Sequence, residues 1–175
     1  MIEVTIDSIR VSLMSQHRVV VLKEVDAARY LAIWIGPDTA EAITMELQNV
    51  AVARPMTHDL VKNIVLQMGA KISHIVINEL RNDVFFAQIV LDMQGRSIEV
   101  DARPSDALAL AVRAGSKVFI NQRVMDLAGI SPETGLDIGD EFDDQGDVKE
   151  EDLDIFRDFV DSLDLDDLLP PKDPV

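Results

Sequence analysis

A histidine stands between an arginine and an aspartate where the sequence predicts the start of a helix. Arg54 precedes a proline, and His58 and Asp59 follow within the segment RPMTHDL. An arginine guanidinium can hold a phosphate through two parallel hydrogen bonds. A histidine titrates near neutral pH and can therefore move a proton. Because the free N–H groups of a helix start also attract anions, these residues predict a phosphate site with acid–base chemistry.

The same order of residue types recurs in the segment RPSDAL, before a second predicted helix. Here Arg103, Ser105 and Asp106 are present, but the histidine is not. Thr57 in the first segment and Ser105 in the second are each expected to be the N-cap of their helix. The repetition has two interpretations, a weak internal duplication or a chance similarity of two short strings.

The predicted site has a catalytic part and a phosphate-binding part. The catalytic residues are His58, Asp59 and Asp106, and either aspartate could orient the imidazole or hold a divalent metal such as Mg²⁺. The residues predicted to bind phosphate are Arg54, Thr57, Arg103 and Ser105. A purely structural interpretation also fits these strings, because an acid in the first turn stabilises a helix and the preceding arginine can pair with it.

The strands that must position these helices are visible as apolar patterns. Residues 2–6 alternate between apolar and polar, and the apolar phase then shifts by one residue, which predicts a bulge near residues 7–8. The continuous apolar run Val19–Leu22 predicts a strand that is buried on both faces. Further strands are expected at residues 30–35, 71–78, 84–92, 97–102 and 117–120.

Three main helices are expected among these strands, beginning near Pro37, Thr57 and Ser105. The second should pack one apolar face inward, made of Leu60, Val61, Ile64, Val65 and Met68. Trp34 and Tyr30 are expected in the core. The order of elements predicts an α+β fold with a mixed, mainly antiparallel sheet of about seven strands.

The charge divides the chain into two predicted parts. The net charge is −16, and residues 137–175 hold 16 acids and three bases, which leaves 16 acids and 13 bases in residues 1–136. Residues 1–136 are therefore predicted to form one domain at −3, and residues 137–175 an acidic tail at −13. The tail carries one apolar stripe at helical spacing, which predicts an amphipathic helix that docks on the body or on a protein partner. The stripe consists of Leu153, Phe156, Phe159, Val160 and Leu163.

Composition excludes several classes of site and location. The sequence has no cysteine, so it can form neither a disulfide nor a thiolate metal site. Its first residues lack the features of a secretory signal, and no apolar run approaches the roughly 20 residues of a membrane span, so a cytoplasmic protein without a membrane partner is expected. A basic surface of the kind that nucleic-acid-binding proteins usually carry is not evident.

Five strings of the sequence together resemble the bifunctional nuclease family, which is named for DNase and RNase activity. They are IWIGPDTAEAI, RPMTHDLVKNIV, VINEL, FFAQIVLD and VDARPSDALALAVRAG, within a resemblance that covers roughly residues 1–130. The matching positions are Gly36, Glu41, Arg54, Pro55, Thr57, His58, Asp59, Arg103, Pro104, Ser105 and Asp106. The family's usual proline in the third strand is Ala32 here. The resemblance implies a compact α+β domain, self-association as a dimer or larger, and nuclease activity in some members.

Two functions from different classes follow. The first is hydrolysis of phosphodiester bonds in single- or double-stranded DNA or RNA, by the residues named above. The alternative is a non-enzymatic regulatory or interaction module, in which the charged helix starts bind a small anion or a partner protein. The near-neutral body and the acidic tail count against a polyanionic substrate, because phosphate binding relies on lysine and arginine.

Overall fold

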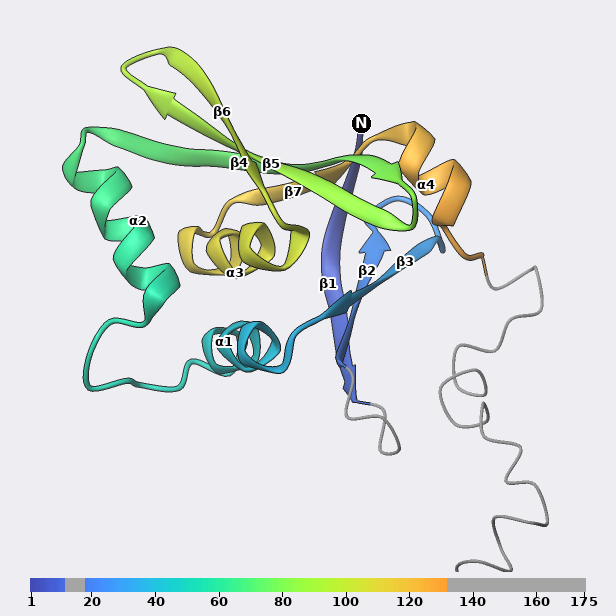
Figure 1. Ribbon diagram of the computed structural model, residues 1–175, viewed down its shortest axis with the longest axis horizontal. Helices are drawn as coiled ribbons and strands as arrows, with labels where there is room; N and C mark the ends of the chain where they lie inside the picture. The colour runs from blue at the N-terminus through green and yellow to red at the C-terminus, as the bar shows by residue number, and fades with distance from the viewer. Residues whose placement is uncertain (12–17, 132–175) are drawn as a thin grey trace, which may run out of the picture. The chain divides into compact units, whose positions relative to one another are not determined.

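The computed structural model describes residues 1–11 and 18–131, which form seven strands and four helices (Figure 1). In chain order the elements are β1 (Ile2–Val11), β2 (Arg18–Glu24), β3 (Tyr30–Ile35), α1 (Pro37–Leu47), α2 (Thr57–Gln67), β4 (Ala70–Arg81), β5 (Val84–Met93), β6 (Arg96–Ala102), α3 (Pro104–Ala114), β7 (Lys117–Ile120) and α4 (Gln122–Ala128). The predicted acidic helix and the rest of the tail lie outside the described residues.

All seven strands join one sheet in the order β3-β2-β1-β7-β4-β5-β6. Every neighbouring pair is antiparallel except β4 and β7, which run parallel. The sheet therefore consists of two antiparallel three-stranded units, β1–β3 and β4–β6, with the short β7 inserted between them. This arrangement confirms the predicted α+β class with a mixed, mainly antiparallel sheet.

The bulge in β1 and the burial of β2, both predicted from the pattern of apolar residues, are present in the structure. The pairing of β1 with β2 shifts register between Ile6 and Ser8, where a bulge was expected. The side chains of Val19–Leu22 are at most 1% exposed, so β2 is covered on both faces. Gln94 and Gly95 both have positive φ, as a tight β5–β6 hairpin turn requires.

The helix α3 is the most deeply buried helix of the described chain. Its residues pack against β4, β5 and β7 on one side and against α1 and α2 on the other. Most of its side chains are buried, and the helix ends at Gly115 in the left-handed conformation that a helix end favours (φ 62°). The start of α3 is thereby fixed relative to the sheet and to both neighbouring helices.

Two expectations about burial were wrong. Trp34 is 60% exposed on β3, because alternate residues of that strand face opposite sides and only Leu31, Ile33 and Ile35 face the core. Tyr30 is half-buried. The second error concerns α2.

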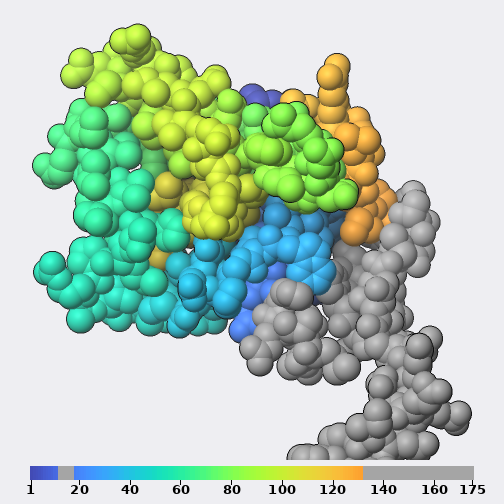
Figure 2. Space-filling model, in the orientation of Figure 1, coloured from blue at the N-terminus to red at the C-terminus, as the bar shows by residue number. Residues whose placement is uncertain are grey.

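The helix α2 has the predicted apolar side chains, but none of its residues is buried. Leu60 is 54% and Ile64 49% exposed, and the helix lies at the surface in the space-filling view (Figure 2). Periodicity identified the apolar face correctly, but it does not say whether the same chain covers that face.

None of the helices in the described ranges has both the length and the apolar character that crossing a membrane requires.

Candidate functional site

The first helix start is organised by Asp59. The helix α2 begins at Thr57, and the residue at the N-cap is Met56, so the prediction that Thr57 is the cap was wrong. Asp59 is the third residue of the helix, and its Oδ2 accepts a hydrogen bond of 2.8 Å from the Met56 backbone N–H. This contact satisfies a donor that the helix itself leaves free. Thr57 is exposed.

The second helix start has an arginine at the cap position. Arg103 is the N-cap of α3 and Pro104 its first residue, so the prediction that Ser105 is the cap was also wrong. Pro104 suits this place because its ring fixes φ and it lacks an N–H that the helix would leave unpaired. Ser105 is 8% exposed, one residue into the helix.

Arg103 and Asp106 form a two-point ion pair at this helix start. The Nε of Arg103 donates to Oδ2 of Asp106 at 2.6 Å, and a terminal nitrogen donates to Oδ1 at 3.1 Å. The pairing of arginine with the acid of the first turn agrees with the structural interpretation of these strings. It leaves the outer edge of the guanidinium available, because an arginine has five N–H donors and the side chain is 76% exposed.

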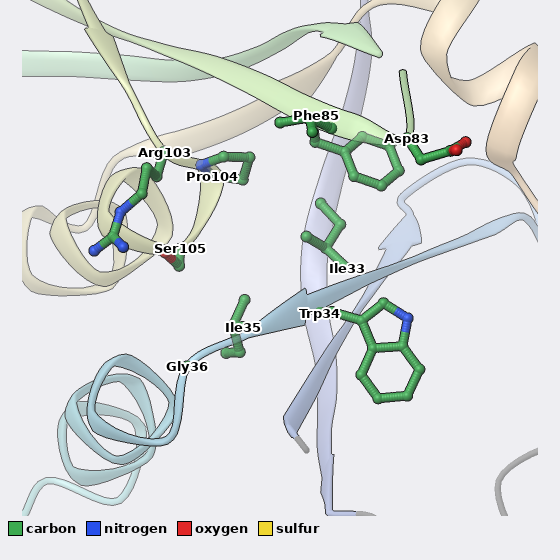
Figure 3. A pocket seen from close by; sticks show the side chains of 10 residues that line it. Ile33, Trp34, Ile35, Gly36, Asp83, Phe85, Arg103, Pro104 and Ser105 are labelled. Atoms are coloured by element: carbon green, nitrogen blue, oxygen red, sulfur yellow. The ribbon is translucent and has the colours of Figure 1, made fainter. Parts of the chain in front are cut away.

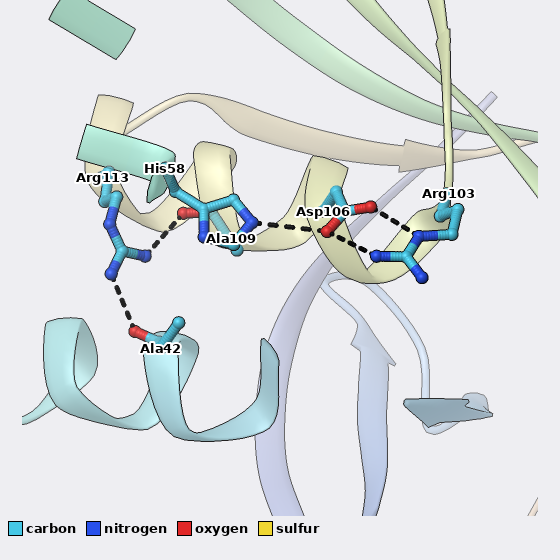
Figure 4. Close-up of polar contacts among 6 residues, drawn as sticks. All are labelled: Ala42, His58, Arg103, Asp106, Ala109 and Arg113. Atoms are coloured by element: carbon cyan, nitrogen blue, oxygen red, sulfur yellow. Dashed lines mark hydrogen bonds and ion pairs between the residues drawn. The ribbon is translucent and has the colours of Figure 1, made fainter. Parts of the chain in front are cut away.

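His58 joins the two helix starts. Its Nε2 lies 3.4 Å from Oδ1 of Asp106, a long contact between residues 48 apart in sequence (Figure 4). The imidazole is largely covered, with 13% of the side chain exposed. If Nε2 carries the proton toward Asp106, Nδ1 is left as a proton acceptor. The arrangement is therefore an arginine and a histidine held on opposite sides of one carboxylate.

The electrostatics keep this carboxylate ionised. Hydrogen bonding from Arg103 lowers the pKa of Asp106, burial opposes that shift, and the contact with His58 adds to it. The same ion pair raises the pKa of the Arg103 guanidinium. At neutral pH the site thus holds a negative Asp106 between its two partners.

Asp59 belongs to a second, more buried cluster around Arg113. The Nε of Arg113 donates to Oδ1 of Asp59 at 2.9 Å. The terminal nitrogens of Arg113 donate to the carbonyls of Ala109 at 2.9 Å and Ala42 at 3.0 Å (Figure 4). The ammonium of Lys62 donates to the Arg113 carbonyl. The Arg113 side chain is only 2% exposed, so it ties α1, α2 and α3 together from the interior.

Sequence reasoning missed Arg113, although a signal for it exists. It is the only cation in the apolar run ALALAVRA, and a charge on a buried helix face requires a partner.

Arg54, by contrast, was predicted to bind phosphate but does not join the other site residues. It is exposed in the loop before α2 and makes no hydrogen bond or ion pair with any described residue. The structure therefore joins His58, Arg103 and Asp106, and it places Asp59 with Arg113.

The two aspartates considered as metal ligands already accept hydrogen bonds from protein donors. Both oxygens of Asp106 face Arg103, and those of Asp59 face Arg113 and the Met56 N–H. Within residues 1–11 and 18–131, no three His, Cys, Asp or Glu side chains form a group that could hold an ion. A divalent ion would have to displace a guanidinium, so this donor set does not fit one as arranged. A role for Mg²⁺ stays a prediction.

Comparison with known proteins places the whole site within a matched region. A family model described as the bifunctional nuclease domain matches residues 20–133. An uncharacterized protein of Mycobacterium tuberculosis is 36% identical over 167 residues, which cover 94% of this chain and 96% of that protein. Bifunctional nuclease 1 of Arabidopsis thaliana is 31% identical over 110 residues, and Bifunctional nuclease 1 of Oryza sativa subsp. japonica 28% over 112. These matches cover 61% and 62% of this chain but 34% of each plant protein.

Proposed function

Because this chain belongs to the bifunctional nuclease domain family, we propose that it hydrolyses phosphodiester bonds of DNA or RNA. The observation that supports a location for this activity is the convergence of His58 and Arg103 on Asp106. A residue that can transfer a proton and a residue that can bind phosphate come from separate segments and share one orienting carboxylate. That convergence is the minimum that general acid–base cleavage of a phosphodiester needs.

In the proposed reaction each of the three residues has one role. The outer edge of Arg103 holds the phosphate and stabilises the charge that grows on its oxygens. His58 takes a proton from the attacking water at Nδ1 as the new P–O bond forms, and it returns a proton to the leaving oxygen as the old P–O bond breaks. Asp106 orients both partners and stabilises the imidazolium between these steps. Asp59 acts at a distance, by holding the start of α2 through Met56 and Arg113.

Cleavage by the full chain tests this proposal. End-labelled single- and double-stranded DNA and RNA would be incubated with wild type, Arg103→Ala and Arg96→Ala, each with and without a chelator. Arg103→Ala is expected to lower the cleavage rate by about 10²-fold, the effect of removing one donor from a developing oxyanion. Arg96 is exposed at the start of β6 and serves as the matched control, with an unchanged rate.

Two outcomes would overturn the proposal. One is the absence of cleavage by the wild-type chain above a mock-purified sample. The other is equal activity of Arg103→Ala and wild type. Loss of all activity in chelator would support the predicted divalent metal and would require Asp106 or Asp59 to exchange a guanidinium for the ion.

The exposed face of α2 supports the proposal that the protein self-associates, as the family resemblance implies. Leu60, Ile64 and Met68 place apolar surface in water on a helix with no buried residue. Burial of such surface contributes about 25 cal/mol per Å², so a second copy that covers it would stabilise a dimer. Light scattering should give a multiple of the 19.4 kDa chain mass, and the double variant Leu60→Glu/Ile64→Glu should shift it to the monomer.

Leu127→Glu is the control for this experiment, because Leu127 is 74% exposed on α4 and distant in sequence. A monomer mass for wild type at micromolar concentration would contradict self-association. A dimer that is unaffected by the α2 double variant would place the interface elsewhere. If such a protein also lacked cleavage activity, the interaction-module function would become the better explanation of the exposed helix.

A further inference from the structure

A hollow of about 300 Å³ lies where the starts of two helices meet (Figure 3). The end of β3 and Gly36, the N-cap residue of α1, line one side of it, and Arg103–Ser105 at the start of α3 line another. The turn before β5 and the first residues of that strand complete the lining. The volume is at the low end of the range of about 300–1,000 Å³ that small-ligand sites occupy. The hollow therefore suits a small chemical group and not a double helix.

Both helix starts have backbone N–H groups that no side chain satisfies. The first helical residue is Pro37 in α1 and Pro104 in α3, and no described side chain caps either helix. The N–H groups of the next two residues in each helix have no partner within the helix. The backbone at Gly36 is also bare, because nothing lies within 4 Å of the place where a side chain would begin. Free N–H groups and the positive ends of two helix dipoles favour an anion here.

The hydroxyl of Ser105 is a second, independent observation that points to a ligand. Ser105 is only 8% exposed, so over nine-tenths of it is buried, and it lines the hollow between the start of α3 and the residues Ile35 and Gly36 (Figure 3). Its hydroxyl makes no hydrogen bond with any described residue. A buried hydroxyl without a partner costs free energy. An oxygen of a ligand in the hollow would accept the missing hydrogen bond.

The charges of the lining favour an anion at the α3 end. Arg103 and Asp83 are the charged residues that line the hollow, and they lie at its opposite ends (Figure 3). Arg103 keeps N–H donors free beyond its pair with Asp106. Asp83, in the turn between β4 and β5, repels an anion from the other end. The apolar side chains of Ile33 and Phe85 lie between these ends and strengthen electrostatic interactions, because they lower the local dielectric.

From this arrangement we infer that the hollow binds the phosphate group of a phosphate monoester, through the Ser105 hydroxyl, Arg103 and the free N–H groups of α1 and α3. A monoester ends in three oxygens that can accept hydrogen bonds from several donors at once. A phosphodiester within a strand has two substituents and offers fewer oxygens. A monoester can come from a nucleotide or from the phosphorylated end of a strand, and inorganic phosphate has the same oxygens. The inference goes beyond the proposed cleavage, because it requires neither His58 nor a reaction.

Calorimetric titration of the full chain tests the site with three probes that contain no phosphodiester bond. They are inorganic phosphate, thymidine 5′-monophosphate and thymidine. Inorganic phosphate and the monophosphate are expected to bind saturably at one site per chain, and thymidine is expected not to bind. Tighter binding of the monophosphate than of inorganic phosphate would identify a nucleotide or a strand end as the source of the group, and equal binding would identify free phosphate.

Two variants should change the affinity for inorganic phosphate in opposite directions. Ser105→Ala should raise the dissociation constant about tenfold, the effect of losing one hydrogen bond to a charged group. Asp83→Asn removes the repelling charge and should lower it about two- to threefold, with a smaller effect at high salt. Asparagine tolerates the left-handed backbone of Asp83 (φ 60°). Ser97→Ala, which removes an exposed hydroxyl on β6, is the control and should not change the affinity.

The outcomes separate this inference from the proposed function. Absence of saturable phosphate binding, or equal affinity of Ser105→Ala and wild type in a protein that melts normally, would overturn the monoester site even if wild type cleaves nucleic acid. Binding of thymidine as tight as that of its monophosphate would also overturn it. Ser105-dependent phosphate binding without any cleavage by wild type would support the site and would overturn the nuclease proposal alone.

Discussion

Replacing His58 with alanine is expected to slow cleavage of single-stranded nucleic acid by about 10²–10⁴-fold, the usual contribution of a general acid–base residue. The expectation follows from the position of the imidazole, 3.4 Å from Asp106 and at the junction of two helix starts. Initial rates with a labelled oligonucleotide at neutral pH would measure it. Strand affinity should change much less than the rate, because Arg103 remains to hold the phosphate.

The control is His74→Ala, which removes an imidazole from β4. His74 contacts the Phe119 ring edge-to-face and has no contact with Asp106 among the described side chains. Its removal should leave the cleavage rate unchanged. Full activity in His58→Ala would show that the observed cleavage comes from a contaminating nuclease or from another site. Asp106→Asn should also slow cleavage, and its melting temperature would report whether the Arg103 pair is needed for folding.

Arg113→Met is expected to give the largest loss of stability of any single exchange in this region. Removing one partner of a buried ion pair typically costs about 3–5 kcal/mol, because the other charge stays behind without compensation. Asp59 retains 25% exposure, so water can partly replace Arg113 and the expected cost is about 3 kcal/mol. Chemical denaturation monitored by circular dichroism would measure the free energy of unfolding.

A double-mutant cycle identifies the pair as the cause. Asp59→Asn and Arg113→Met should each destabilise the protein, and the double variant should be less destabilised than the sum of the two. Arg123→Met serves as the control for loss of an arginine, since Arg123 is exposed on α4, and it should change stability by less than about 0.5 kcal/mol. Strict additivity of the two exchanges would mean that Arg113 stabilises the fold through Ala42 and Ala109 alone.

The contrast between Arg103 and Arg113 shows what the sequence could and could not predict about the site. The RPSDAL string predicted an arginine beside an acid at a helix start, because residues three apart on a helix are always neighbours. Arg113 and Asp59 are 54 positions apart, and their contact depends on how α2 crosses α3. No periodicity encodes that crossing. A buried cation in an apolar helix signals that a partner exists, without identifying it.

A similar limit explains the mistakes about burial and capping. The apolar pattern of α2 was correct, but the pattern is the same for a helix that faces its own core and for one that faces a second molecule. Thr57 and Ser105 were expected at the N-caps because their residue types favour that position. Each helix instead begins one or two residues earlier than that assignment, and the cap positions are held by Met56 and Arg103. Strands were predicted more accurately, since alternation or a fully apolar run determines them locally.

The position of β7 has a consequence for how the chain acquires its structure during synthesis. The units β1–β3 and β4–β6 are made first and can each form by local hairpins, but they share no edge until Lys117–Ile120 has been made. Until then β1 and β4 each expose a row of unpaired backbone groups, the kind of edge that promotes association between chains. A nascent chain on the ribosome must therefore wait for β7, and over that interval the unpaired edges of β1 and β4 stay open to association with neighbouring chains.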